Sequence, residues 1–167
     1  MLFRSKELRR YQTFVFDGWL GGFYASPNLQ GTRPGMPMAA AWAVMRHLGI
    51  AGYVALTRQA LDNADQMRAG IASIDGVRVL GQGQFHLVAM AADPGANPPV
   101  DVFAVGDALR AKGWFHDRQT PPDSLHSSVS NSNTGVIEEY LGDLRACVES
   151  VRGTRAGDRS TQYATLE

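Results

Sequence analysis

A loop rich in glycine and proline, residues 21–35, constrains the fold more than any other stretch of this 167-residue chain. Its glycines permit turns that a Cβ would forbid, and its prolines favour extended backbone at the residues before them. Pro34 suits the first turn of a helix, and the residues that follow, 36–48, are almost all compatible with a helix. The sequence therefore predicts that this loop opens a helix.

Thr32 and Arg33 lie at the start of this predicted helix. A hydroxyl, a guanidinium and the free N–H groups of a helix N-terminus can together bind a phosphate group. The other interpretation is a capped helix in which Arg33 pairs with a carboxylate of its own chain. The residues by themselves favour this second interpretation.

A family resemblance changes that balance. Tyr24-Ala25-Ser26-Pro27, a short spacer and Gly31-Thr32-Arg33-Pro34-Gly35 resemble the segment after the active-site lysine of sphingosine-1-phosphate lyases. These are pyridoxal-phosphate enzymes of fold type I in the group II decarboxylase family, in which a serine usually stands at the position of Thr32. The flanking Arg9-Arg10-Tyr11-Gln12, Ala39-Ala40-Ala41-Trp42 and Gly52-Tyr53 are similar too, and the resemblance covers roughly residues 1–153.

The resemblance implies an α+β fold in three parts. Residues 1–50 would be the end of the large cofactor-binding domain followed by a long, buried connecting helix. Residues 51–153 would form the small C-terminal domain, a short antiparallel sheet covered by helices. Residues 154–167 would be a polar tail, disordered or dependent on a partner.

The pattern of elements after residue 50 agrees with that fold. Apolar residues recur every three or four positions over 53–74, which predicts an amphipathic helix. Two strands (77–80 and 86–91), a helix (101–112), two further strands (114–118 and 125–130) and a last helix capped by Thr134 and ending at Val151 follow. Nearer the N-terminus, 1–4 could end a strand, and Ser5 could cap a helix over 6–12. Helix 34–48 is apolar on nearly every side and is expected to be buried all round.

The resemblance also assigns the candidate cofactor-binding residues Thr32, Tyr24 and Gly31. In such lyases the active site forms at a homodimer interface, where the hydroxyl matching Thr32 reaches the cofactor phosphate of the neighbouring subunit. The tyrosine matching Tyr24 lies beside the same pocket. A threonine and a phenol are neutral donors that can bind phosphate oxygens, so the change from serine keeps the donor.

Neither lysine of this chain is expected to hold pyridoxal phosphate. Pyridoxal-phosphate chemistry needs a lysine amine for the Schiff base. Lys6 and Lys112 are the lysines of the chain, and both stand in contexts predicted to be exposed. We therefore expect no catalytic residue here and a chain that is inactive alone, because the resemblance implies that it begins just after the catalytic lysine. The four histidines and the single cysteine show no metal-ligand spacing.

Three interpretations follow. The first is a fragment of a sphingosine-1-phosphate-lyase-like enzyme, which cleaves a phosphorylated long-chain amino alcohol to a fatty aldehyde and phosphoethanolamine. The second is a fragment of a pyridoxal-phosphate-dependent amino-acid decarboxylase, in which Arg118 could bind the substrate carboxylate. The third is a non-enzymatic interaction module derived from this fold.

Composition indicates which partners and which cellular compartment to expect. Sixteen basic and sixteen acidic residues cancel, which argues against a nucleic-acid partner. A single cysteine fits a reducing, cytoplasmic compartment. No apolar run approaches the roughly 20 residues of a membrane span, so no transmembrane segment is expected.

Overall fold

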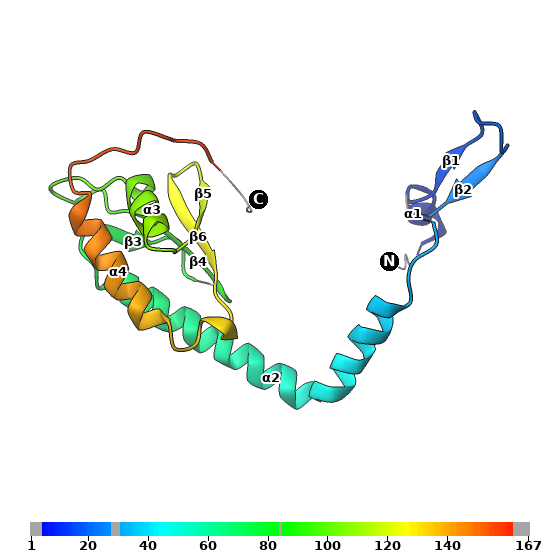
Figure 1. Cartoon of the computed structure of the whole chain (residues 1–167), viewed down its shortest axis with the longest axis horizontal. Helices are drawn as coiled ribbons and strands as arrows, with labels where there is room; N and C mark the ends of the chain where they lie inside the picture. Colours follow the sequence, from blue (N-terminus) through cyan, green and yellow to red (C-terminus); the bar gives the residue numbers. More distant parts are fainter. Residues whose placement is uncertain (1–4, 28–30, 84, 162–167) are drawn as a thin grey trace. The chain divides into compact units, whose positions relative to one another are not determined.

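The computed structural model describes residues 5–27, 31–83 and 85–161, and its contacts divide the chain into two units (Figure 1). Unit 1 is Met1–Gly49 and unit 2 is Ile50–Glu167. Each unit is described by itself. The expected strand over 1–4 lies outside the described residues, and the functional division at residues 50 and 153 stays a prediction.

Unit 1 begins with a short helix and a two-stranded sheet. Helix α1 (Lys6–Arg10) has Ser5 as its N-cap, whose hydroxyl accepts a hydrogen bond from the Glu7 N–H, so the predicted cap is confirmed. Strands β1 (Phe14–Phe16) and β2 (Tyr24–Ser26) pair antiparallel, with Phe16 opposite Tyr24. The glycines and prolines of residues 21–35 predict a loop where the structure has β2. That was wrong, because pairing with β1 satisfies its backbone groups despite the neighbouring glycines.

Helix α2 (Met36–Ala72) joins the two units and is broken at Gly49, whose φ of 58° and ψ of −177° are not helical. The predicted helix end at Gly49 is therefore confirmed, because glycine adopts this conformation without the penalty of a Cβ. The first half of α2 is exposed: Met36 is 77% and Trp42 64% accessible. The expected all-round burial is thus not found in this chain.

The length and apolar composition of α2 alone would allow it to cross a membrane, contrary to the expectation from the sequence. Two features argue for a cover of protein instead. The break at Gly49 releases backbone groups that a bilayer cannot hydrogen-bond. The second half of the helix is also amphipathic, since Ala64 and Ile71 are fully buried in unit 2 while Asp62 on the same helix is exposed.

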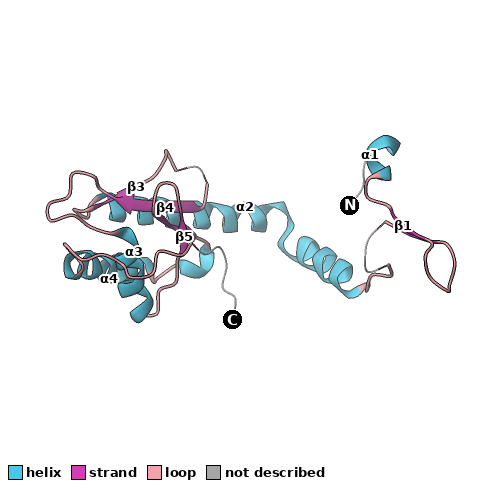
Figure 2. Ribbon diagram, turned by 90° about the horizontal axis from the view of Figure 1, so that it is seen from above, coloured by secondary structure: helices cyan, strands magenta, loops and turns pink. Residues whose placement is uncertain are grey.

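Unit 2 is an α+β fold, as predicted (Figure 2). Its sheet has four antiparallel strands. The strand order is β3 (Val77–Val79), β4 (Leu87–Ala92), β6 (Ser124–Ser128), β5 (Asp117–Gln119). Helices α3 (Val102–Ala111) and α4 (Ile137–Ser150) contribute to the core with the second half of α2. Leu125 of β6 is 1% exposed, and side chains at alternate positions of the sheet enter this core.

Two contacts hold α2 against the remainder of unit 2. A Cβ at Gly70 would lie 2.2 Å from Leu141 Cδ1, so the absence of a side chain lets α2 approach α4 closely. The Asn63 amide donates hydrogen bonds to the Ser130 carbonyl and to the Thr134 hydroxyl, both at 2.9 Å. Thr134 therefore does not cap the last helix as predicted; it ends a short 3-10 turn, η1 (Asn131–Asn133), and α4 starts three residues later at Ile137.

The start of the C-terminal tail is docked, which overturns the expectation of a disordered segment for residues 154–161. The Ala156 N–H donates to Asp101 Oδ2 at 3.1 Å, and Arg118 donates to the Asp158 carbonyl at 2.9 Å. The composition of residues 154–161 does not reveal this docking, because the side chains that bind the segment, Asp101 and Arg118, lie elsewhere in the chain. Residues 162–167 lie outside the described part of the chain.

Candidate functional site

The predicted cofactor-binding residues lie in unit 1. Tyr24 belongs to β2, and Gly31 and Thr32 lie in the loop before α2. Tyr24 is the first residue of β2, and its ring packs edge-on against Trp19, with ring centroids 6.4 Å apart. A Cβ on Gly31 would lie 3.3 Å from the Tyr24 hydroxyl oxygen. The Tyr24 hydroxyl therefore lies against the Gly31 backbone, and two of the three predicted residues are brought together.

Gly31 is suited to this place for two reasons. Its φ is +62°, the left-handed region that favours glycine, and a side chain there would press on the Tyr24 hydroxyl. The Thr32 hydroxyl follows directly in the chain and makes no hydrogen bond to another described residue. Thr32 and Tyr24 each carry a neutral hydroxyl, a group that can donate a hydrogen bond to a phosphate oxygen.

The helix-start part of the prediction is wrong. Helix α2 begins at Met36, so Thr32 lies four residues before it and is not among the free N–H groups of its first turn. Pro34 lies outside the helix as well, because the loop stays non-helical through Gly35. Arg33 is exposed, and no carboxylate within the described ranges forms an ion pair with it. Neither a phosphate site at the helix N-terminus nor a capped helix with a paired Arg33 is therefore seen.

The two lysines are placed differently from a lysine that would hold a cofactor. Lys112 Nζ lies 2.8 Å from Asp143 Oδ1, and this hydrogen bond raises the pKa of Lys112. A raised pKa keeps the amine protonated, whereas nucleophilic lysines need a lowered one. Lys6 belongs to the first turn of the exposed helix α1.

Arg118, the candidate carboxylate-binding residue of the decarboxylase interpretation, is already engaged within unit 2. Its guanidinium pairs with Asp107 and donates to the carbonyls of Phe103 at 3.2 Å and Asp158 at 2.9 Å. The side chain is 13% exposed. These contacts give Arg118 a structural role and leave it unsuited to a substrate carboxylate.

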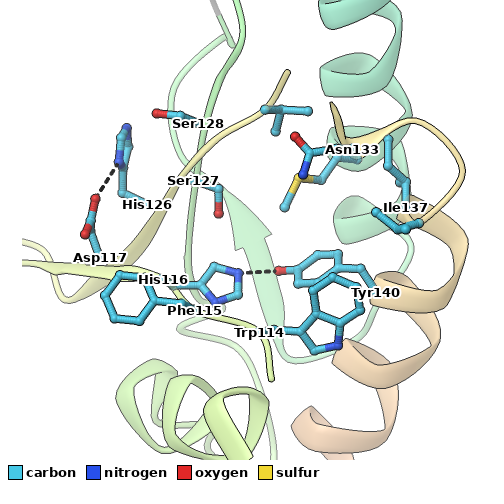
Figure 3. A pocket seen from close by; sticks show the side chains of 13 residues that line it. Trp114, Phe115, His116, Asp117, His126, Ser127, Ser128, Asn133, Ile137 and Tyr140 are labelled. Atoms are coloured by element: carbon cyan, nitrogen blue, oxygen red, sulfur yellow. Dashed lines mark hydrogen bonds and ion pairs between the residues drawn. The ribbon is translucent and has the colours of Figure 1, made fainter. Parts of the chain in front are cut away.

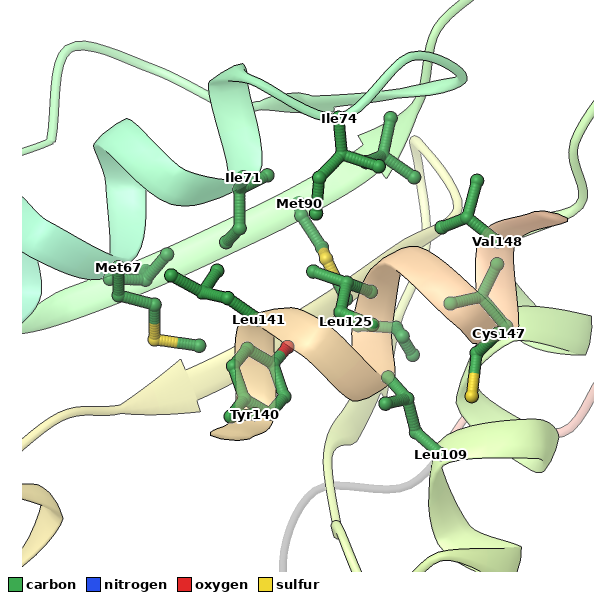
Figure 4. Packing of buried hydrophobic residues seen from close by; sticks show 14 of the residues in the cluster. Met67, Ile71, Ile74, Met90, Leu109, Leu125, Tyr140, Leu141, Cys147 and Val148 are labelled. Carbon is green, nitrogen blue, oxygen red and sulfur yellow. The ribbon is translucent and has the colours of Figure 1, made fainter. Parts of the chain in front are cut away.

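A second candidate site, which the sequence analysis did not find, is a pocket of about 230 Å³ within unit 2 (Figure 3). It lies where β5 begins, β6 ends and α4 starts, and Met67 of α2 contributes to its wall. His116 and Tyr140 meet across it, with His116 Nε2 3.0 Å from the Tyr140 hydroxyl oxygen. Met67 and Tyr140 also belong to the core (Figure 4), so the pocket opens directly beside it.

Burial controls the ionisation of the two groups. It lowers the pKa of His116 to about 4, although the nearby Asp117 opposes the change. Burial also raises the pKa of Tyr140. Both side chains are therefore neutral near pH 7. Sequence reasoning missed this pair of residues, because they come from separate elements of the fold. In the described part of the chain, no group of His, Cys, Asp or Glu could hold a metal.

Comparisons with known proteins give a consistent set of relatives. The chain is 35% identical to sphingosine-1-phosphate lyase of Oryza sativa over 166 residues, which is 98% of this chain and 30% of that protein. It is 32% identical to the Arabidopsis thaliana lyase, over 91% of this chain and 27% of that protein. The chain thus spans about a third or less of the relatives that it matches. No protein-family model matches it.

Solved structures agree. The sphingosine-1-phosphate lyase of Burkholderia pseudomallei aligns with a TM-score of 0.73 and 35% identity, over 90% of this chain and 33% of that one. Glutamate decarboxylase of Lactobacillus brevis aligns with a TM-score of 0.69 at 14% identity, over 88% of this chain, a likeness that concerns the fold alone. The aligned part is the C-terminal portion of these structures.

Proposed function

Because the chain is homologous to the C-terminal part of sphingosine-1-phosphate-lyase-like pyridoxal-phosphate enzymes of the group II decarboxylase family, we propose that it serves the same carbon–carbon cleavage. The substrate would be a phosphorylated long-chain amino alcohol, and the products a fatty aldehyde and phosphoethanolamine. One observation carries the proposal: in the family motif at residues 24–35 the Tyr24 hydroxyl lies against Gly31, and the Thr32 hydroxyl makes no hydrogen bond to another described residue.

In this proposal the chain supplies phosphate contacts to a cofactor whose lysine lies elsewhere. Pyridoxal phosphate, when bound, accepts the electrons of the bond that breaks. Thr32 and Tyr24 would donate hydrogen bonds to the phosphate, and Gly31 would allow its close approach. We propose that the cofactor belongs to the neighbouring subunit of a homodimer. Neither lysine of the chain fits a Schiff base, so the isolated chain is proposed to be inactive.

The exposed surface of unit 1 supports a role within a larger enzyme. Trp42, Met45 and Phe23 are each more than half exposed in this chain. Apolar side chains in such number normally mark a surface that another protein region covers. The relatives are between three and four times as long as the part that this chain matches, and we propose that the remainder of such an enzyme covers this surface.

The decarboxylase alternative has less support. The decarboxylase neighbours share only the fold with this chain. Arg118, its candidate substrate-binding residue, is held by Asp107 and by two backbone carbonyls. We therefore favour the lyase.

Two experiments test the proposal. In the first, the isolated chain is mixed with pyridoxal phosphate and reduced with borohydride, and the modified peptides are mapped. We expect no stoichiometric labelling of Lys6 or Lys112; specific labelling together with lyase activity would contradict the proposal.

The second experiment is a chimera. The segment of the Burkholderia enzyme that aligns with this chain is replaced by residues 1–153, and cleavage of sphingosine 1-phosphate is measured. We expect a dimer that binds the cofactor and cleaves the substrate. A folded dimer without cleavage would favour the interaction module instead.

A further inference from the structure

One part of the wall of the pocket beside the core of unit 2 is apolar. Trp114, Tyr140, Met67 and Ile137 line it with aromatic and aliphatic surface. The Trp114 and Tyr140 rings pack edge to face with centroids 5.3 Å apart, and the Trp114 N–H is already donated to Asp143 at 2.9 Å. These side chains are therefore fixed, and they offer a ligand mainly apolar contact.

Three polar groups face one another at the side of the pocket. His116 and Tyr140 are joined at 3.0 Å. The Ser127 hydroxyl, on β6, points toward this pair (Figure 3) and makes no hydrogen bond to any other residue that the structure describes. A ligand hydroxyl placed there could both donate and accept, because serine and tyrosine hydroxyls do both.

The charges around the pocket select against an anion. His116 is neutral, so it brings no positive charge to the pocket. The ionisable pair that also lines the pocket is His126 and Asp117, whose Nδ1 and Oδ2 atoms are 3.7 Å apart. The carboxylate of Asp117 adds negative charge to this wall of the pocket, which disfavours an anionic ligand.

The volume of the pocket is sufficient for one aromatic ring. A dry cavity of about 150 Å³ lined by apolar side chains binds benzene. The pocket of about 230 Å³ is half as large again, which allows one ring with a small substituent.

We propose that this pocket is a binding site for a small, uncharged aromatic alcohol of the phenol class. The ring would lie among Trp114, Met67 and Ile137, and the hydroxyl would bind at Ser127 and the His116–Tyr140 pair. All of these residues belong to unit 2.

The test is titration of the complete 167-residue chain with phenol, toluene and benzoate by NMR. We expect saturable binding of phenol, with contacts from its ring protons to the methyl groups of Met67 and Ile137. Toluene should bind about two- to ten-fold more weakly, the factor of one neutral hydrogen bond, and benzoate more weakly still. No saturable phenol binding, or equal binding of benzoate, would overturn the proposal.

Variants sharpen the test. Ser127→Ala should lower phenol affinity by about two- to ten-fold and leave toluene unchanged. Ser127→Leu should fill the space and abolish both. Ser73→Ala, an exposed serine that does not line the pocket, is the control and should change neither. If Ser127→Leu does not fold, the contacts to Met67 and Ile137 in the unaltered chain decide; contacts elsewhere would overturn the proposal.

Discussion

Asp101 and Arg159, 58 residues apart in the chain, form an ion pair in which Arg159 Nη1 lies 2.6 Å from Asp101 Oδ2. The other oxygen of the same carboxylate accepts the Phe103 N–H at 3.0 Å and so caps α3. Arg159 also pairs with Asp123 and lies over the Phe103 ring, 5.0 Å from its centroid. One carboxylate thus joins the start of a core helix to the C-terminal segment.

Replacing Asp101 should therefore destabilise unit 2. We expect Asp101→Ala to lower the free energy of unfolding by about 1–2 kcal/mol, the usual cost of losing an N-cap. Asp62→Ala, an exposed aspartate of α2, should have little effect. Urea denaturation followed by circular dichroism measures both changes, and equal stability of the two variants would contradict this role.

Acid should weaken the same contact. Burial disfavours the charged form of Asp101, but hydrogen bonds from Ala156, Phe103 and Arg159 outweigh it and lower the pKa of the carboxyl group below 3.8. The folded state then binds the proton less readily than the unfolded state. The stabilisation is present above the unfolded pKa and is lost as pH falls through the folded one. Unfolding curves between pH 5 and pH 2 should show this loss in the parent chain and not in Asp101→Ala.

Arg159→Ala should release the segment that follows Val151. We expect faster hydrogen exchange at the Ala156 amide, which donates to Asp101, because the ion pair no longer holds the segment in place. Arg145→Ala, on the exposed side of α4, serves as the matched control. Unchanged exchange in Arg159→Ala would show that the segment is held by its backbone contacts alone.

The parts of the fold that the sequence predicted are those with strong local signals. Helices α3 and α4 were predicted within a few residues, because their apolar residues recur at helical spacing and Asp101 and Gly113 mark the ends of α3. The hairpin of β1 and β2 was missed, since each strand has three residues and lies largely exposed. The docked tail was missed because its partners are distant in sequence.

The candidate sites divide in the same way. Tyr24, Gly31 and Thr32 are predicted as cofactor-binding residues from a motif, and this role stays a prediction, whereas the contact of Tyr24 with Gly31 needed the structure. The helix start was misplaced because Pro34 is compatible with both a first turn and an extended loop. The pocket of unit 2 was invisible in the sequence, since Ser127, His116 and Tyr140 come together only when β6, the segment before β5, and α4 pack.

His116 should make the stability of unit 2 depend on pH. An unfolded histidine has a pKa near 6.5, and burial lowers that of His116 to about 4. Between these values the unfolded state binds a proton that the folded state does not. Stability should therefore fall by about 2 kcal/mol as pH drops from 7 to 5. Urea unfolding at both pH values checks this, and His116→Gln should remove most of the difference, whereas His47→Gln, at an exposed position, should not.

Gly31 should be sensitive to the smallest side chain. In the chimera with the Burkholderia enzyme, Gly31→Ala combines an unfavourable φ of +62° with a Cβ 3.3 Å from the Tyr24 hydroxyl. We expect cofactor affinity to fall about ten-fold, since a strain of about 1–2 kcal/mol is enough for that factor. Gly35→Ala is the matched control, because a Cβ there meets nothing within 4 Å. Equal affinities would show that the Tyr24–Gly31 contact does not shape the site.

The measurement that tests the central claim most directly is dissociation of pyridoxal phosphate from the same chimera carrying Thr32→Ser or Thr32→Val. Serine keeps the hydroxyl and should be nearly silent, whereas valine keeps the shape and removes the donor. A hydrogen bond to a charged group contributes about 1.5–3 kcal/mol, so the valine variant should bind the cofactor about ten-fold to somewhat over a hundred-fold more weakly. If both variants hold the cofactor equally well, Thr32 is only a loop residue and its phosphate role is wrong.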